Sequence, residues 1–143
     1  MKNSLKTLQR IQKFNIDEQR KILVDLQTKQ DQLKVEFARL NQNYEAEKAY
    51  AVQHPGLGNF GAFVKRYLEK KEALETAIDK MQQAIEEVRD RIADMFKEQK
   101  TYEIVDDNRR KREIKEENDK EQKMLDEVGT NTYIKKHEAG AQN

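Results

Sequence analysis

The sequence predicts an all-α protein: a long two-helix antiparallel coiled-coil hairpin in which the second helix overhangs the first. Two heptad patterns and one Pro-Gly pair predict this fold. Apolar residues recur at a and d spacing over residues 5–51 and again over residues 60–102. Between the two patterns stands the only proline of the chain, Pro55, followed by Gly56. A helix is forced to stop at such a pair, so the chain folds back there.

The register of the two helices follows from the position of this turn. In an antiparallel pair an a position lies opposite a d position, so the numbers of paired residues have a constant sum. A sum of 111 places the turn between Pro55 and Gly56 and sets Leu26 opposite Ile85. It also sets Gln12 opposite Gln99 as a matched polar layer. The other expected layers are Ala51/Phe60, Tyr44/Tyr67, Phe37/Leu74, Leu33/Ile78, Leu23/Val88 and Ile16/Met95.

The hairpin is expected to occupy residues 1–128, followed by a flexible C-terminal tail over residues 129–143. Asn59 is expected to cap the second helix, and Gly129 is expected to end it. The expected segments of the hairpin are a first helix over about residues 4–53, a turn over residues 53–59 and a second helix over about residues 60–128.

In this register the second helix runs past the start of the first after about Asp107. The composition changes at that point to DDNRRKREIKEENDKEQK, in which Ile114 is the only apolar residue. Acid-before-base pairs four residues apart, such as Glu116 with Lys120, favour a solvated helix there. A short apolar face then returns at Met124, Leu125 and Val128. That end of the helix is therefore expected to bind a partner.

The composition excludes several other classes of protein. The mean hydropathy is -1.11 and 38% of the residues are charged, too polar for a thick globular core. No apolar run approaches the roughly 18 residues that span a bilayer, and the start, MKNSLKTLQR, lacks the apolar core of a signal peptide. We therefore expect a cytoplasmic protein without direct membrane insertion. The absence of cysteine excludes disulfides and thiol catalysis.

The sequence predicts no catalytic residue, no cofactor and no metal site. The two histidines, His54 and His137, have no cysteine and no second histidine at ligand spacing. The glycine-rich segment 56–61 follows no expected strand and lacks the Lys-Ser/Thr ending of a phosphate-binding loop. We therefore expect a protein that is not an enzyme.

One basic cluster is a candidate for contact with nucleic acid or with an anionic surface. Acidic residues flank it on both sides, and the formal net charge of the chain is only +1. A continuous basic face along a phosphate backbone is therefore not formed, and we expect no nucleic acid as partner. An acidic protein surface suits the cluster better. Its members are Arg109, Arg110, Lys111 and Arg112.

Both ends of the chain resemble the FliJ family of flagellar type III export proteins and its virulence-secretion counterparts. The opening SLKTLQRIQKFNIDEQRKIL is similar to the family, and the segment EENDKEQKMLDEVGTNTYIKK, residues 116–136, is more specifically so. The segment around the turn adds nothing to the resemblance. The most telling positions are Glu117, Asn118, Gln122, Lys123, Asp126 and Glu127.

The resemblance implies a coiled-coil stalk, similar in shape to the central shaft of rotary ATPases. Such a stalk inserts into the hexameric flagellar export ATPase, promotes assembly of its ring and links it to the cytoplasmic domain of the membrane export gate. The resemblance also implies binding to the regulator of the ATPase and escort of export chaperones. It further implies a role in motility and a cytoplasmic location, peripheral to the inner membrane at the flagellar base.

Two surfaces are expected to carry these contacts. The ring-facing surface combines the basic cluster and the telling positions above with Met124, Leu125 and Val128. The gate-facing patch implied by the resemblance lies near Phe37, Leu40, Tyr44, Leu74, Ala77 and Met81. The heptad pattern places most of this patch in the seam, so the same residues equally fit a plain core. A generic coiled-coil scaffold, or a holdase chaperone that grips clients with its helix ends, is the alternative function.

Overall fold

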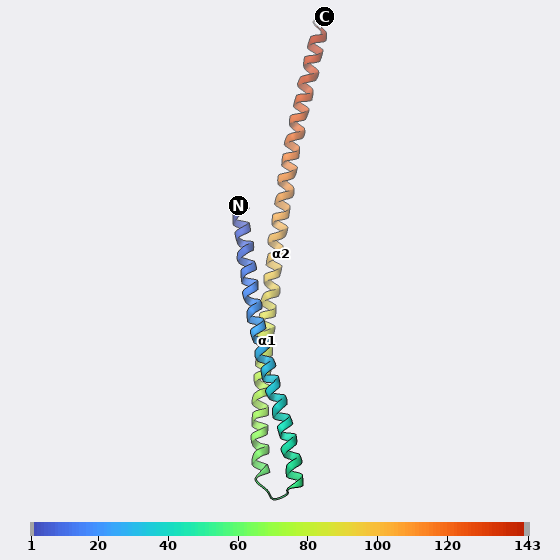
Figure 1. The fold of residues 1–143 in the computed structure, drawn as a ribbon. Helices are drawn as coiled ribbons and strands as arrows, with labels where there is room; N and C mark the ends of the chain where they lie inside the picture. Colours follow the sequence, from blue (N-terminus) through green and yellow to red (C-terminus); the bar gives the residue numbers. More distant parts are fainter. Residues whose placement is uncertain (1, 142–143) are drawn as a thin grey trace.

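The computed structural model describes residues 2–141 as two long helices that pack against each other (Figure 1). α1 spans Lys2–Gln53 and α2 spans Phe60–Ala141, and no strand occurs in this range. At 1.5 Å per residue, α1 is about 80 Å long and α2 about 120 Å long. Figure 1 shows α2 continuing alone beyond the start of α1. The all-α hairpin with an overhanging second helix is confirmed.

The core is a single seam between the two helices. Few side chains of the seam are fully buried, and the residues opposite them on the other helix are mostly half-buried. Each helix covers the other from one side only, so the edges of the seam stay open to solvent. The rings of Tyr44 and Tyr67 stack with their centroids 4.0 Å apart, as the predicted register requires. The most buried apolar residues are Ile16, Tyr67, Ile85 and Val88.

Buried amides interrupt the seam and find polar partners across it. Gln30 donates a hydrogen bond from Nε2 to Oε1 of Gln82 at 2.8 Å. Gln12 donates to the main-chain oxygen of Met95 at 2.9 Å and to Oε2 of Glu98 at 3.2 Å. Within the predicted layer of Gln12 and Gln99, the buried amide of Gln12 thus donates its hydrogen bonds to a main-chain carbonyl and a carboxylate. In a register shifted by one heptad Gln30 would face Leu74 or Val88, so this polar layer favours one alignment.

The turn is built by Pro55 and two glycines. The main-chain N–H of Leu57 donates to the oxygen of His54 at 3.3 Å, and Gly56 has a φ of 88°. This is the arrangement of a type II β-turn, which places proline second and glycine third. Gly58 also has a positive φ of 76°. Asn59 then caps α2, because its Oδ1 accepts a hydrogen bond from the N–H of Ala62 at 3.1 Å.

The end of α2 differs from the prediction. The helix does not stop at Gly129 but continues to Ala141, so the described part of the expected tail is helical. Residues 142–143 of that expected tail lie outside the described residues. Gly129 has no positive φ, and one glycine inside a helix costs only about 1 kcal/mol. The helix proceeds through it, with the Thr130 and Thr132 hydroxyls donating to the carbonyls of Asp126 and Val128.

The overhang gains little from its own side chains. The expected pair of Glu116 with Lys120 is not within ion-pair distance in the structure, and every residue from 111 to 140 is exposed. The side-chain hydrogen bonds along it are local, from Gln122 to Asp126 at 3.2 Å, from the two threonine hydroxyls to the carbonyls above, and between His137 and Tyr133. Neither helix has a stretch within residues 2–141 that is both long and apolar enough for a membrane crossing.

The register is tested by cysteine crosslinking in a chain whose described residues contain no cysteine. Cysteines at Leu26 and Ile85 should form a disulfide within one chain, because these positions share a layer of the seam. Leu26 paired with Ile78 or with Ile92 represents a shift of one heptad and should crosslink poorly. Gel mobility under non-reducing conditions measures the yield. More efficient crosslinking of a shifted pair than of Leu26 with Ile85 would contradict the register.

The division between seam and surface is tested by one substitution at two positions of α2. Ile85 is 1% exposed and Ile114 is 59% exposed. Ile85→Ala should lower the free energy of unfolding by about 2–4 kcal/mol, since it leaves a cavity in the seam. Ile114→Ala should change it by less than about 0.5 kcal/mol. Urea denaturation followed by circular dichroism measures both, and equal losses would show that the seam is wrongly placed.

Candidate partner-binding surfaces

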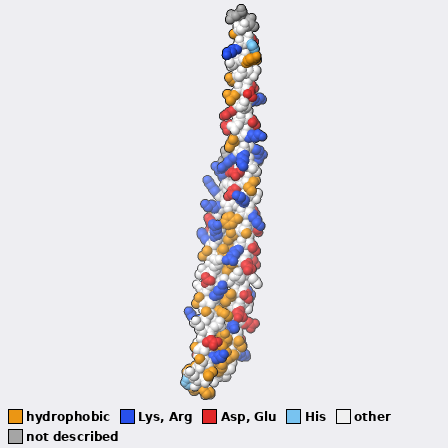
Figure 2. Space-filling view, turned by 90° about the vertical axis from the view of Figure 1, so that its right-hand side faces the viewer, with side chains coloured by type: hydrophobic (Ala, Val, Ile, Leu, Met, Phe, Trp, Pro, Cys, Tyr) orange, Lys and Arg blue, Asp and Glu red, His pale blue; other side chains and the backbone are white. Residues whose placement is uncertain are grey.

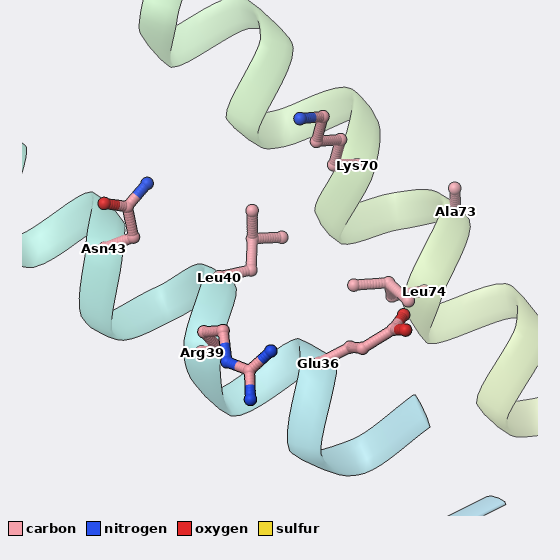
Figure 3. A pocket seen from close by; sticks show the side chains of 7 residues that line it. All are labelled: Glu36, Arg39, Leu40, Asn43, Lys70, Ala73 and Leu74. Atoms are coloured by element: carbon pink, nitrogen blue, oxygen red, sulfur yellow. The ribbon is translucent and has the colours of Figure 1, made fainter. Parts of the chain in front are cut away.

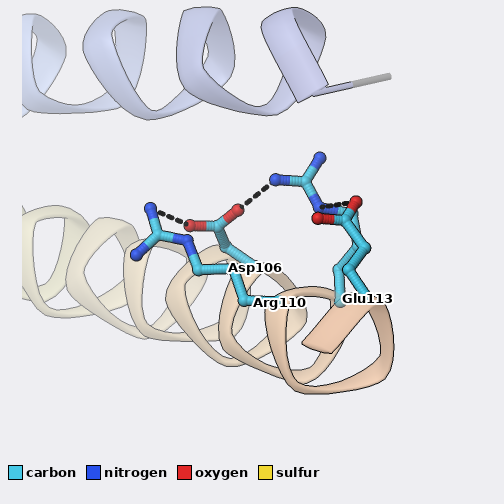
Figure 4. Close-up of polar contacts among 4 residues, drawn as sticks. Asp106, Arg110 and Glu113 are labelled. Atoms are coloured by element: carbon cyan, nitrogen blue, oxygen red, sulfur yellow. Dashed lines mark hydrogen bonds and ion pairs between the residues drawn. The ribbon is translucent and has the colours of Figure 1, made fainter. Parts of the chain in front are cut away.

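A buried carboxylate marks the point where the paired helices end. Asp106 lies on α2 near the start of α1 and is only 7% exposed. Its Oδ1 is 2.7 Å from Nη2 of Arg109, and its Oδ2 is 3.1 Å from Nη2 of Arg110. Glu113 extends the cluster, with Oε1 at 3.9 Å from Nε of Arg109 (Figure 4). Asp106 is thus held by two arginines from the next turn of its own helix.

The start of α1 gives this carboxylate a second favourable neighbour. In Figure 4 the Asp106 carboxylate points toward the first turns of α1. The N-terminus of a helix carries a partial positive charge, and α1 has no acidic residue in its first turn. Asp106 supplies the missing negative charge from the other helix. Sequence reasoning missed this role, although arginines three and four residues after an aspartate were the available signal.

The basic cluster is divided by these contacts. Arg109 is half-buried and Arg110 is exposed, and both charges are partly neutralised by Asp106. Lys111 and Arg112 are exposed and form no ion pair among the described residues. Two of the four cations therefore stabilise the base of the overhang, and two remain open to a partner.

The rest of the expected ring-facing surface lies on the exposed overhang of α2. Its apolar members are 60–65% exposed and follow one another within little more than one helical turn. These three side chains are Met124, Leu125 and Val128. The polar members are exposed on the same stretch or up to about two turns before it: Glu117, Asn118, Gln122, Lys123, Asp126 and Glu127. The helix spreads these residues around its circumference instead of gathering them in a pocket.

The gate-facing patch lies in the paired half of the rod nearer the turn. Each of its six members, Phe37, Leu40, Tyr44, Leu74, Ala77 and Met81, is half-buried. A half-buried side chain contributes to the seam and also presents one edge to solvent. The two interpretations of the patch, as core and as contact surface, are therefore compatible.

An open groove of about 570 Å³ exposes part of this patch between α1 and α2. Leu40 and Leu74 point toward each other across it, and Ala73 adds a third apolar side (Figure 3). The polar lining residues are Glu36, Arg39, Asn43 and Lys70. An apolar floor with charged edges suits a peptide or helix of a protein partner better than a small polar ligand.

The described residues contain no group of three or more His, Cys, Asp or Glu side chains that could hold a metal ion. The two described histidines each contact a tyrosine four residues earlier, His54 with Tyr50 and His137 with Tyr133. Both pairs are exposed and lie at opposite ends of the rod.

Comparison with known proteins gives one match. Residues 1–138 match the protein family described as Flagellar FliJ protein. A comparison with curated proteins and a comparison with solved structures each found no match. The match covers almost the whole 143-residue chain, including both helices and the turn. The chain therefore belongs to the flagellar FliJ family, and it is a component of the flagellar protein export apparatus.

Proposed function

We propose that the protein is a stalk of the export apparatus, with the overhang of α2 threaded into the ring of the hexameric export ATPase. The observation that carries this proposal is a bare, fully exposed helix that extends from an otherwise paired rod. Beyond Asp106 the overhang is about 50 Å long at 1.5 Å per residue. A single helix of that length, about 10 Å across, suits the central channel of a ring.

Two kinds of contact on the overhang support the ring as its partner. Lys111 and Arg112 offer unpaired cations at its base, and their charges attract acidic loops of a partner. Met124, Leu125 and Val128 offer apolar surface further out, which gains about 25 cal/mol for each Å² removed from water. A channel that surrounds the helix contacts both groups at once, whatever their angular positions.

The gate-facing patch is proposed as the second contact of the stalk. The groove between Leu40 and Leu74 exposes apolar surface on the paired part of the rod, far from the overhang (Figure 1). A partner that fills it touches side chains of both helices. Binding of the ATPase regulator and escort of export chaperones are further proposed roles that rest on the family, as does a peripheral location at the flagellar base.

A general scaffold or holdase is the less well supported alternative. A holdase of the hairpin type grips clients with apolar surface at its free helix ends. The C-terminal overhang here carries isolated apolar residues among many charges (Figure 2). The family match further favours a dedicated export component. Aggregation assays with an unrelated denatured client should therefore show no protection at equimolar stalk.

The ring contact is tested in the full-length chain by replacing Met124, Leu125 and Val128 together with glutamine. The triple variant should bind the export ATPase at least 10-fold more weakly, because residues at contact centres each contribute more than about 1 kcal/mol. Its stimulation of ATP hydrolysis should fall in parallel. Val24→Gln with Val35→Gln is the matched control, since both valines are exposed on the paired shaft. Equal losses in the two variants would argue against a ring contact at the overhang.

A truncation separates the fold of the hairpin from the action of the overhang. A chain ending after Lys115 retains Asp106 with Arg109, Arg110 and Glu113. It should keep the melting temperature of the full chain, because residues beyond that point make no contact with α1. It should also fail to restore motility to cells that lack the protein. Normal motility with the truncated chain would show that the overhang beyond Lys115 is not needed for export, which contradicts the proposed ring contact.

A further inference from the structure

The turn of the hairpin is unlike the rest of the chain in charge. Residues 49–64 contain no Asp, Glu, Lys or Arg, whereas 38% of all residues are charged. At that average a segment of this length would carry about six charges. We call residues 49–64 the hairpin tip. It comprises the end of α1, the turn and the first turn of α2, and it lies at the opposite end of the rod from the overhang (Figure 1).

Large apolar side chains project from the tip into solvent. Tyr50, Val52 and Leu57 are between 53% and 76% exposed, and Pro55 between them is also exposed. Figure 2 shows hydrophobic side chains gathered at this end of the rod. The three exposed side chains lie outside the seam layers. Their exposure is unfavourable in water, and in a chain this polar it indicates a binding surface.

The tip is held in a fixed shape from behind. Tyr44 stacks on Phe60 and Phe63 as well as on Tyr67, with centroid distances of 4.0–6.4 Å. The hydrogen-bonded turn at Pro55 and the cap at Asn59 set the path of the chain between the helices. The exposed apolar residues are therefore presented on a rigid, convex end, which lowers the entropic cost of binding.

The first charges on either side of the tip are basic. Lys48 precedes it, and Lys65 and Arg66 follow it; all three are exposed and without an ion pair among the described residues. The nearest acids, Glu47 and Glu69, lie further back along the rod. Apolar residues at the end of a rod with cations just behind them match the boundary between lipid headgroups and acyl chains.

We propose that the hairpin tip docks on the surface of an anionic phospholipid bilayer. Val52 and Leu57 enter the boundary between headgroups and acyl chains, Tyr50 stays at the headgroup level, and the three cations meet lipid phosphates. This contact is shallow and spans nothing, but it departs from the sequence-based expectation of no direct membrane insertion. It does not depend on the ATPase contact, because it uses only the other end of the rod.

The dimensions of the tip favour a bilayer over a second copy of the chain. Two helices of about 10 Å diameter present an end of roughly 200 Å², whereas a stable protein interface buries about 800 Å² per partner. Two tips placed end to end would also bring like cations together. Binding to a lipid surface does not require a contact area of about 800 Å². A bilayer also accommodates a convex apolar end without a complementary cavity.

A single tryptophan reports the proposed contact, because the chain contains none of its own. Leu57→Trp in the full-length chain should shift its emission to shorter wavelength on vesicles of equal parts phosphatidylethanolamine and phosphatidylglycerol. The shift should be much smaller on pure phosphatidylcholine vesicles. Val35→Trp is the matched control on the shaft, with a similarly exposed parent side chain, and it should not shift on either vesicle.

The cations are tested in the Leu57→Trp background by changing Lys48, Lys65 and Arg66 to glutamine. Partition onto the phosphatidylglycerol vesicles should fall roughly 100-fold, as expected for the loss of three surface charges. Circular dichroism confirms that the variants remain helical. No emission shift for Leu57→Trp, or an equal shift for Val35→Trp, would overturn the proposal. Capture of a protein by a photo-crosslinker at Leu57, with no response to vesicles, would assign the tip to a protein partner instead.

Discussion

Antiparallel pairing of α1 and α2 in one register is the interaction on which the other features of the protein depend. The seam contains few fully buried side chains, among them Ile16 and Ile85, so its alignment relies on more than apolar contact. Gln12 and Gln30 find partners across the seam in this alignment. The stacked rings of Tyr44 and Tyr67 fix it near the turn. Because α1 is 52 residues long and α2 is 82, the same alignment decides where the overhang begins.

The two ends of the rod consequently differ in chemistry. At one end the pairing stops at Asp106, near the start of α1, and α2 continues as a charged single helix with a few exposed apolar residues. At the other end the turn closes the hairpin with an uncharged, apolar tip. If the ATPase ring surrounds the overhang and the hairpin tip lies on the membrane, the half-buried patch near Leu40 and Leu74 lies in the part of the rod nearer the membrane. A stalk that joins an ATPase to a membrane gate requires two ends that differ in this way.

Much of the fold was predictable from the sequence, because heptad spacing and a Pro-Gly turn are local signals. The end of α1 at Gln53, the start of α2 at Phe60 and the layer of Tyr44 with Tyr67 agree with the predictions. The partner of Gln12 was not predictable, since a long amide reaches several acceptors and only the folded seam selects among them.

Other features depended on competition between weak local preferences. Gly129 was expected to end α2, but its modest cost in a helix did not outweigh continuation to Ala141. The burial of Asp106 arises where the start of one helix meets the side of another, and no periodic pattern encodes that meeting. The gate-facing patch follows only from the family resemblance, because the heptad pattern by itself assigns most of its residues to the seam, and in the structure they are half-buried.

The proposed stalk function requires that the single-helix overhang, and not the paired hairpin, occupies the ATPase ring. Electron cryomicroscopy of the full-length protein with the hexameric ATPase tests this most directly. We expect density for one helix inside the ring, density for two helices outside it from near Asp106 onward, and the turn at the far end. Two-helix density inside the channel, or the Pro55 turn within the ring, would contradict it.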